Sequence, residues 1–211
     1  MRFFLPATGL LRKWRYGKPV VIVSGLPRSG TSMLMSMLEA GGLTIMSDQI
    51  RQADEDNPKG YFEYERVKNL AEDADKSWVR DGRDKALKVI SHLLKDLPDD
   101  NFYHVVFARR DLEEVVTSQN LMLKRRDEAN PVDDARAVDL YRKHLINVRL
   151  LARRRPNFRM LEVVYGEIID EPALWTARMN RFLGGKLNEQ AMSAVVDSRL
   201  YRNRKEELGA S

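Results

Sequence analysis

Residues suited to binding phosphate gather in one stretch near the N-terminus, V-I-V-S-G-L-P-R-S-G-T-S-M-L, which begins at position 21. Backbone N–H groups in a glycine-rich turn, together with the positive end of a following helix, bind phosphate oxygens. The ATP-binding pattern G-x-x-x-x-G-K-[ST] is met at Gly25, Gly30 and Ser32, but Thr31 stands in place of the lysine. Arg28 carries the positive charge of the turn. We therefore expect a phosphate-binding loop that is not built for ATP.

The elements that position this loop follow from the spacing of apolar residues. A continuous apolar run predicts a strand at 20–24, and further apolar-rich segments predict strands at 103–108 and 159–165 and a weaker one at 86–90. Helical spacing predicts helices at 31–40, 66–78, 112–124, 134–154 and 172–183, a helical turn that stops at 97, and a polar loop at 48–64. This alternation predicts a doubly wound α/β domain of the P-loop type, with a mainly parallel sheet, helices on both faces and ligands at the carboxyl ends of the strands.

Composition limits the class of protein. With 211 residues, 43% apolar and 32% charged, the chain fits one domain over 1–211, in which 1–18 form a basic arm. The absence of cysteine excludes disulfides and thiolate metal sites. No apolar run approaches the roughly 20 residues of a membrane span, and the N-terminus does not resemble a signal peptide. We expect a cytoplasmic protein, monomeric or homodimeric, and the net charge of +5 suits a polyanionic ligand.

Three alternatives to a specialised phosphate enzyme are weaker. An ordinary strand-turn-helix corner would not explain two glycines, a proline, an arginine and four hydroxyl residues within the nine positions from Ser24 to Ser32. A nucleotide or small-molecule kinase would need the missing lysine and a strand that ends in a Mg²⁺-binding acid. A nucleic-acid-binding module would have aromatic residues near the basic runs at 124–126 and 153–155, and only Phe158 lies close. No nucleic acid is therefore expected as a partner.

The loop sequence G-L-P-R-S-G-T-S resembles the motif P-[KR]-S-G-T-[TS] of the sulfotransferases that use 3′-phosphoadenosine-5′-phosphosulfate (PAPS) and release the bisphosphate PAP, bacterial members included. In that family the motif binds the 5′-phosphosulfate. The resemblance implies that Arg28, Ser29, Gly30, Thr31 and Ser32 bind this end of PAPS, and that Arg28 also assists the transfer.

A second stretch, V-V-F-A-R-R-D-L-E-E-V-V-T-S-Q, resembles the family's 3′-phosphate motif, in which an arginine after a strand precedes a helical serine by eight positions. Arg110 and Ser118 have this spacing. The resemblance implies that both bind the 3′-phosphate, which distinguishes PAPS from ATP. The alternative is a surface ion pair of Arg110 with Glu113 or Glu114 and a serine that merely lies on the helix surface.

Further matches are less specific and extend the resemblance over about residues 20–204. M-L-E-V-V-Y resembles the family's strand that ends in tyrosine, which implies that Tyr165 lies against the adenine unless it is a core residue. The basic tail R-L-Y-R-N-R-K stands where the family closes a basic loop over the 3′-phosphate. We assign that role to Arg202, with Arg199 and Arg204 as alternatives.

The segment L-K-V-I-S-H resembles the family's K-T-H segment, so Lys88 is expected to stabilise the leaving oxygen unless it is a surface lysine. The resemblance implies in-line, metal-independent sulfuryl transfer to a hydroxyl or amine of a small molecule, saccharide, lipid or peptide. Three residues compete for the general base: Glu63 first, Asp48 second and His92 third. A relative that binds PAP or PAPS without turnover also remains open.

Overall fold

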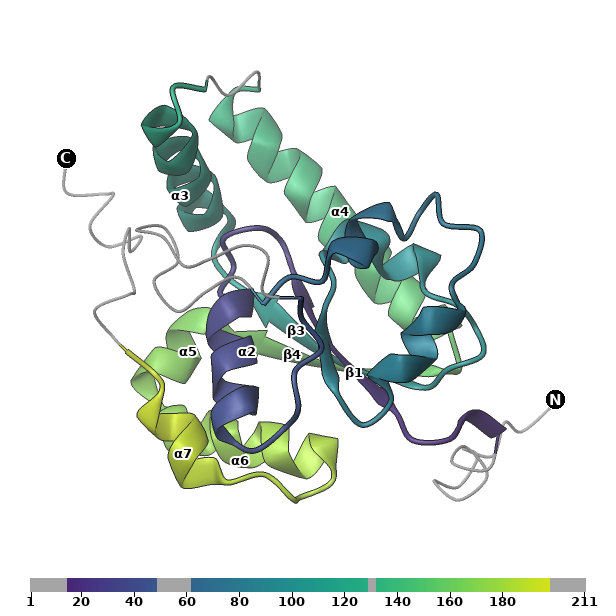
Figure 1. Ribbon diagram of the computed structural model, residues 1–211. Coiled ribbons are helices and arrows are strands. Elements are labelled where there is room, and N and C mark those ends of the chain that lie inside the picture. Colours follow the sequence, from purple (N-terminus) through teal and green to yellow (C-terminus); the bar gives the residue numbers. More distant parts are fainter. Residues whose placement is uncertain (1–14, 49–61, 129–131, 198–211) are drawn as a thin grey trace, which may run out of the picture.

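The computed structural model describes residues 15–48, 62–128 and 132–197. Four parallel strands form one sheet in the order β2-β1-β3-β4 (Figure 1). The strands are β1 (Val20–Gly25), β2 (Ala86–Lys88), β3 (Tyr103–Arg109) and β4 (Phe158–Val164). The α/β fold and the parallel sheet predicted from the apolar runs are confirmed.

Helices cover both faces of this sheet, as predicted. The α-helices are α2 (Thr31–Ala40), α3 (Leu112–Arg125), α4 (Asp134–Arg154), α5 (Tyr165–Asp170), α6 (Pro172–Leu183) and α7 (Glu189–Ala194). Three short 3₁₀ helices are η1 (Glu65–Asn69), η2 (Ser77–Gly82) and η3 (Ser91–Asp96). Figure 1 shows α2, α5, α6 and α7 grouped on one side of the sheet.

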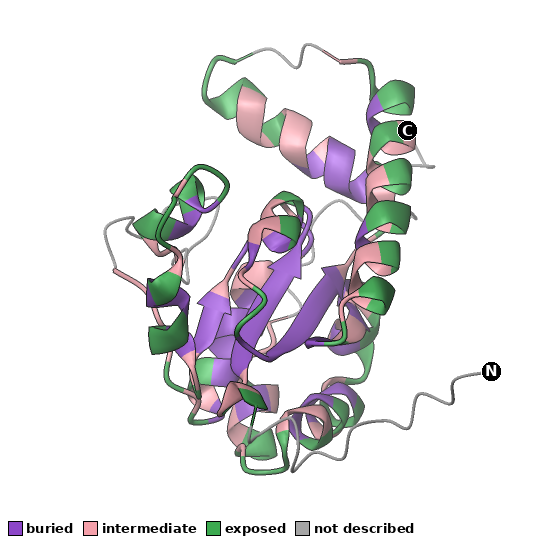
Figure 2. Ribbon diagram, turned by 90° about the vertical axis from the view of Figure 1, so that its right-hand side faces the viewer, coloured by how far each residue is buried: buried purple, intermediate pink, exposed green. Residues whose placement is uncertain are grey.

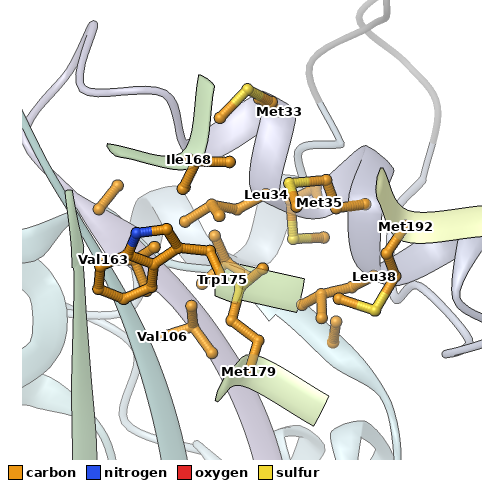
Figure 3. Packing of buried hydrophobic residues seen from close by; sticks show 14 of the residues in the cluster. Met33, Leu34, Met35, Leu38, Val106, Val163, Ile168, Trp175, Met179 and Met192 are labelled. Carbon is orange, nitrogen blue, oxygen red and sulfur yellow. The ribbon is translucent and has the colours of Figure 1, made fainter. Parts of the chain in front are cut away.

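Alternate residues of β1 build two separate cores. Val21 and Val23 pack with α2 and with Trp175, Met179 and other buried residues of α5, α6 and α7 (Figure 3). Val20 and Ile22 point to the opposite face, where α4 and the three 3₁₀ helices cover them. Figure 2 shows the buried strands between these two layers. Because β1 is buried on both faces, it is a continuous apolar run rather than an alternating one.

The carboxyl ends of β1 and β3 meet where the chain changes direction across the sheet. From β1 the connection through α2 leads to β2 on one side, whereas α3 and α4 carry the chain from β3 to β4 on the other. In open parallel sheets, ligands bind at such a switch point. Here Gly25 pairs with Ala108, and a Cβ on Gly25 would lie 2.9 Å from the Ala108 carbonyl oxygen. The two segments that contain the predicted phosphate motifs therefore begin side by side.

The helix predicted at 66–78 is wrong. The segment forms η1 and the start of η2, with a polar turn between them. In that turn the Asp73 carboxylate accepts a hydrogen bond from the N–H of Asp75, and the Asp75 carboxylate accepts one from the N–H of Ser77. Such local side-chain acceptors compete with helical hydrogen bonding. Smaller differences are that Tyr165 begins α5 instead of ending a strand, and that α7 was not predicted.

An ion-pair network fastens α4 to the sheet beside the candidate ligand edge. Glu162 of β4 accepts hydrogen bonds from Arg149 of α4 at 2.6 and 2.8 Å and from Arg109 of β3 at 3.1 Å. The hydrogen bonds from Arg149 lower the pKa of Glu162, an effect that outweighs burial, and Arg109 lowers it further. The network is part-exposed, so each pair contributes less than about 1 kcal/mol.

This network predicts a pH-dependent stability difference. Because the folded-state pKa of Glu162 is lowered, Glu162 contributes fully to the free energy of unfolding above its unfolded-state pKa of about 4.3. This contribution is lost as the pH falls below that value and through the lower folded-state pKa. We expect Glu162→Gln to melt about 2–4 °C below wild type at pH 7, and the gap to close toward pH 3. Thermal melting of both proteins across this range measures it. A gap that stays constant with pH would contradict the assignment.

Candidate active site

The loop between β1 and α2 has a conformation set by its own hydrogen bonds. Buried Ser29 donates both its N–H and its hydroxyl to the Leu26 carbonyl, at 3.2 and 2.7 Å. Arg28 has φ of 67° and Gly30 has φ of 99°, both left-handed. Gly30 precedes the first turn of α2, and no side chain caps that end. The N-terminal end of a helix, where backbone N–H groups lack intrahelical acceptors, is a common site for binding an anion.

The ring of Tyr165 packs against this loop at Gly30. A Cβ on Gly30 would lie only 2.3 Å from Tyr165 Cδ2, so the ring packs directly against the glycine. The guanidinium carbon of Arg110 lies 5.1 Å from the centroid of the same ring. Tyr165 is buried, and desolvation raises its pKa. The expected adenine contact stays a prediction, and the structure shows the ring in contact with the loop and with Arg110.

The two predicted phosphate motifs meet in one cluster. Arg28 donates from Nε to the hydroxyl oxygen of Ser118 at 3.1 Å, and Arg110 donates from Nη1 to the Arg28 carbonyl at 3.4 Å. Arg110 also pairs through Nε with Glu114 at 2.8 Å. The side chains of this pair are 7% and 4% exposed. The ion pair considered in the sequence analysis therefore exists, but it is buried beside the loop and not on the surface.

A lysine from the neighbouring strand reaches the same loop. Lys88, the last residue of β2, pairs with Val23 of β1 and donates from Nζ to the Ser32 hydroxyl at 3.2 Å. Ser32 lies in the first turn of α2. A cation from β2 thus reaches this loop, whereas the ATP-binding pattern has its lysine at position 31. The structure brings Lys88 to Ser32, a contact between residues 56 positions apart that sequence spacing alone does not predict.

Two of the three candidate bases are neighbours. The N–H of Asp48 donates to the Glu63 carbonyl at 3.2 Å, and the Asp48 carboxylate accepts from the N–H of Glu65. Glu63 lies 3.7 Å from the Lys68 ammonium. Ile45 forms a parallel bridge with Ala86, which directs the following residues toward the carboxyl edge of β2. Asp48 and Glu63 therefore lie on the side of the sheet edge where Lys88 emerges.

His92, the third candidate, has a different environment. Its ring stacks on His144 of α4, with centroids 3.9 Å apart and an interplanar angle of 11°. Nε2 of His144 lies 2.8 Å from the hydroxyl of buried Ser91. Desolvation lowers the pKa of both histidines. The pair joins η3 to α4, and the contacts found for His92 lead to α4 rather than to the phosphate loop.

The remaining sequence predictions concern the tail and metals. Arg199, Arg202 and Arg204 lie outside the described residues. Within the described residues, no three His, Asp or Glu side chains are grouped so as to hold a metal ion. None of the described helices is long and apolar enough to cross a membrane. The pair of Arg110 with Glu114 was expected only as a surface alternative, and its burial beside the loop was not predicted, although the i, i+4 spacing indicates the pair itself.

The sequence matches the family model of the sulfotransferase domain over residues 18–208. No curated protein matches it. Among solved structures, the sulfotransferase domain from the Synechococcus PCC 7002 olefin synthase is similar, with a TM-score of 0.54 and 17% identity over 99% of this chain and 86% of that one. A sulfotransferase from Alicyclobacillus acidocaldarius has a TM-score of 0.49 and 14% identity over 92% and 90% of the two chains.

Proposed function

The chain belongs to the sulfotransferase domain family, and we propose that it moves a sulfuryl group from PAPS to a hydroxyl or amine acceptor. The observation that carries this proposal is the cluster of Arg28, Arg110 and Ser118 beside a loop that takes its lysine from β2. A ligand with anionic groups at both its 5′ and 3′ ends would occupy both halves of this cluster. ATP has anionic groups only at its 5′ end.

The donor set fits such a ligand. Lys88 of β2, Arg110 after β3 and Ser118 of α3 bring cations and a hydroxyl to the loop, and Glu114 is paired with Arg110. Guanidinium groups and hydroxyls bind phosphate by charge-assisted hydrogen bonds. We assign Arg28, Thr31, Ser32 and the backbone of Gly30 to the phosphosulfate, and Ser29 to holding the loop in shape.

Arg110 and Ser118 are assigned to the 3′-phosphate, with Arg202 as a further contact from the tail and Tyr165 beside the nucleotide. When bound, PAPS would supply the sulfuryl group, and PAP would be its leaving group. Lys88 would place positive charge where the leaving oxygen gains negative charge, the kind of electrostatic stabilisation that gives enzymes their largest single gain. Since the sulfuryl group carries less charge than a γ-phosphoryl group, we propose that no metal ion is required.

The general base must accept the proton of the acceptor. We keep Glu63 first and Asp48 second, because their backbones are joined near the edge of β2 from which Lys88 emerges. His92 ranks last, because its stacking on His144 holds it against α4. Comparing kcat of Glu63→Gln, Asp48→Asn and His92→Asn identifies the base. A full rate in both carboxylate variants would remove both carboxylates from consideration.

Thermal melting with PAP, with ATP plus Mg²⁺, and without ligand tests the proposed donor. A ligand at about 100 times its Kd adds about 2.7 kcal/mol, so we expect PAP to raise Tm by roughly 5–10 °C. ATP plus Mg²⁺ should have little effect. A shift with ATP and Mg²⁺ alone would overturn the proposal in favour of a kinase, and a shift with PAP but no turnover would favour a relative that only binds the nucleotide.

Variants of the arginine pair localise the effect. The PAP shift should vanish in Arg110→Ala and in the double variant Arg110→Ala/Glu114→Ala, which leaves no unpaired carboxylate buried. Arg109→Ala is the matched control, because Arg109 is the last residue of β3, directly before Arg110, but pairs with Glu162. Each shift is measured against the variant's own Tm without ligand. If the PAP shift were lost in Arg109→Ala but kept in Arg110→Ala, the assignment of the 3′-phosphate to Arg110 would be wrong and Arg109 would be its ligand.

A further inference from the structure

The outer face of α4 exposes apolar side chains. Within the residues that the structure describes, six large apolar side chains are exposed, and three of them belong to this one helix: Leu140, Ile146 and Leu150, at 49%, 50% and 41%. At about 100° per residue these three positions fall within roughly 120° of the helix circumference, whereas buried Ala137 and Val148 lie on the opposite side. Figure 2 shows exposed segments along the whole length of α4. Single exposed leucines are normal on a protein surface, but such a group marks a candidate interaction surface.

Cations surround these apolar side chains. The exposed basic residues within or beside the same arc of the helix are Arg136, Arg142, Lys143, Arg153 and Arg154. Between positions 136 and 154 the one acid is Asp139, which pairs with Lys143 at 2.6 Å. Arg149 and Arg155 instead turn inward, to Glu162 and to the Leu97 carbonyl. The outer face of α4 therefore combines exposed aliphatic groups with an excess of positive charge.

This combination suits the surface of a bilayer that contains anionic lipids. At such a surface, aliphatic side chains enter the boundary between headgroups and acyl chains, while Lys and Arg lie among the anionic headgroups. With 21 residues α4 is about 32 Å long, and its outer face is convex, so contact with a fluid bilayer needs no groove. A second copy of the chain fits this face less well, because two such faces would bring like charges together.

We propose that the outer face of α4 attaches the protein peripherally to membranes that contain anionic lipids. The helix lies parallel to the membrane surface, with Ile146 and Leu150, one helical turn apart, at the centre of the contact and the cations around them. The helices on the other face of the sheet, which pack against Val21 and Val23, point away from the lipid. This inference is independent of the proposed function, because it uses none of the residues assigned to PAPS.

Co-sedimentation of the full chain with vesicles tests this proposal. One set of vesicles contains phosphatidylcholine alone, and the other an equal mixture of phosphatidylcholine and phosphatidylglycerol. We expect binding to the anionic vesicles to be at least about tenfold tighter, and to weaken as salt is added, because salt screens the attraction between the cations and the headgroups. Equal binding to both sets, or no binding to the anionic vesicles, would overturn the proposal.

Two double variants locate the contact. Ile146→Ser/Leu150→Ser removes aliphatic groups from its centre and should weaken binding to anionic vesicles by about tenfold. Arg153→Gln/Arg154→Gln removes two charges and should weaken it by roughly twentyfold. All four side chains are exposed, so both variants should melt at the wild-type temperature. If the vesicles bound both variants as tightly as wild type, α4 would not be the attachment face.

Matched controls lie on the opposite face of the sheet. Leu174→Ser changes an exposed leucine of α6, and Arg181→Gln/Lys186→Gln removes two exposed cations in and after the same helix. Both should keep full binding. Light scattering reports on a second copy: a dimer that dissociates in Ile146→Ser/Leu150→Ser would assign the face to self-association and overturn the proposal. Double-stranded DNA bound as tightly as the anionic vesicles, with no effect of Ile146→Ser/Leu150→Ser, would also overturn it.

Discussion

Gly30→Ala is expected to destabilise the domain by about 2–5 kcal/mol and to abolish PAP binding. Gly30 has φ of 99°, a conformation that costs an L-residue about 1–2 kcal/mol. Its new Cβ would also lie 2.3 and 2.8 Å from Cδ2 and Cε2 of Tyr165. That ring is buried beneath Arg110, so relief would move either the loop or the residue assigned to the 3′-phosphate. Overpacking of this kind adds about 1–3 kcal/mol.

A second glycine of the chain provides a matched control for the steric contribution to the loss of stability in Gly30→Ala. Gly42 has φ of 94°, and a Cβ there would meet nothing within 4 Å. Gly42→Ala should therefore lose only the conformational 1–2 kcal/mol and keep PAP binding. Urea unfolding and calorimetry measure both quantities. Tyr165→Leu in the Gly30→Ala protein should recover part of the stability. Equal losses in the two alanine variants would show that contact with Tyr165 does not matter.

The fold could be predicted because its signals are local and strong. A strand buried on both faces is mostly apolar rather than alternating, which made β1 and β3 recognisable as apolar runs. The prediction of a helix at 66–78 failed because the carboxylates of Asp73 and Asp75 accept hydrogen bonds from the backbone N–H groups that follow them. These hydrogen bonds compete with those of a helix. Such a competition is decided by turn geometry rather than by periodicity. The spacing alone therefore could not reveal it.

For the candidate site too, local motifs could be predicted, whereas contacts between distant segments could not. The loop and the spacing of Arg110 and Ser118 lie within single motifs, and the sequence indicated them. The contact of Arg28 with Ser118 depends on the pairing of β1 with β3, which no local pattern contains. The stacking of His92 on His144 likewise depends on where α4 lies over the sheet. Sequence thus indicated the candidate residues, while their partners required the tertiary structure.

Lys88→Ala is expected to lower kcat by about 10²–10³-fold while changing PAP affinity less than tenfold. The ammonium contacts Ser32 at the start of α2, beside the loop that would hold the phosphosulfate. Charge on the leaving oxygen grows only in the transition state, so a cation placed there contributes mainly to kcat. The measurement is PAP formation from PAPS with a hydroxyl acceptor found by screening, alongside calorimetry with PAP.

Lys85→Ala is the control for this substitution, because Lys85 precedes β2 and lies at the opposite end of the strand. It should keep both the rate and the affinity. Lys88→Arg retains the charge but not the geometry and should recover part of kcat. If Lys88→Ala lost PAP affinity as strongly as kcat, the lysine would be a ground-state contact to the nucleotide. Stabilisation of the leaving oxygen would then fall to Arg28 and the first N–H groups of α2, which remain at the loop in this variant.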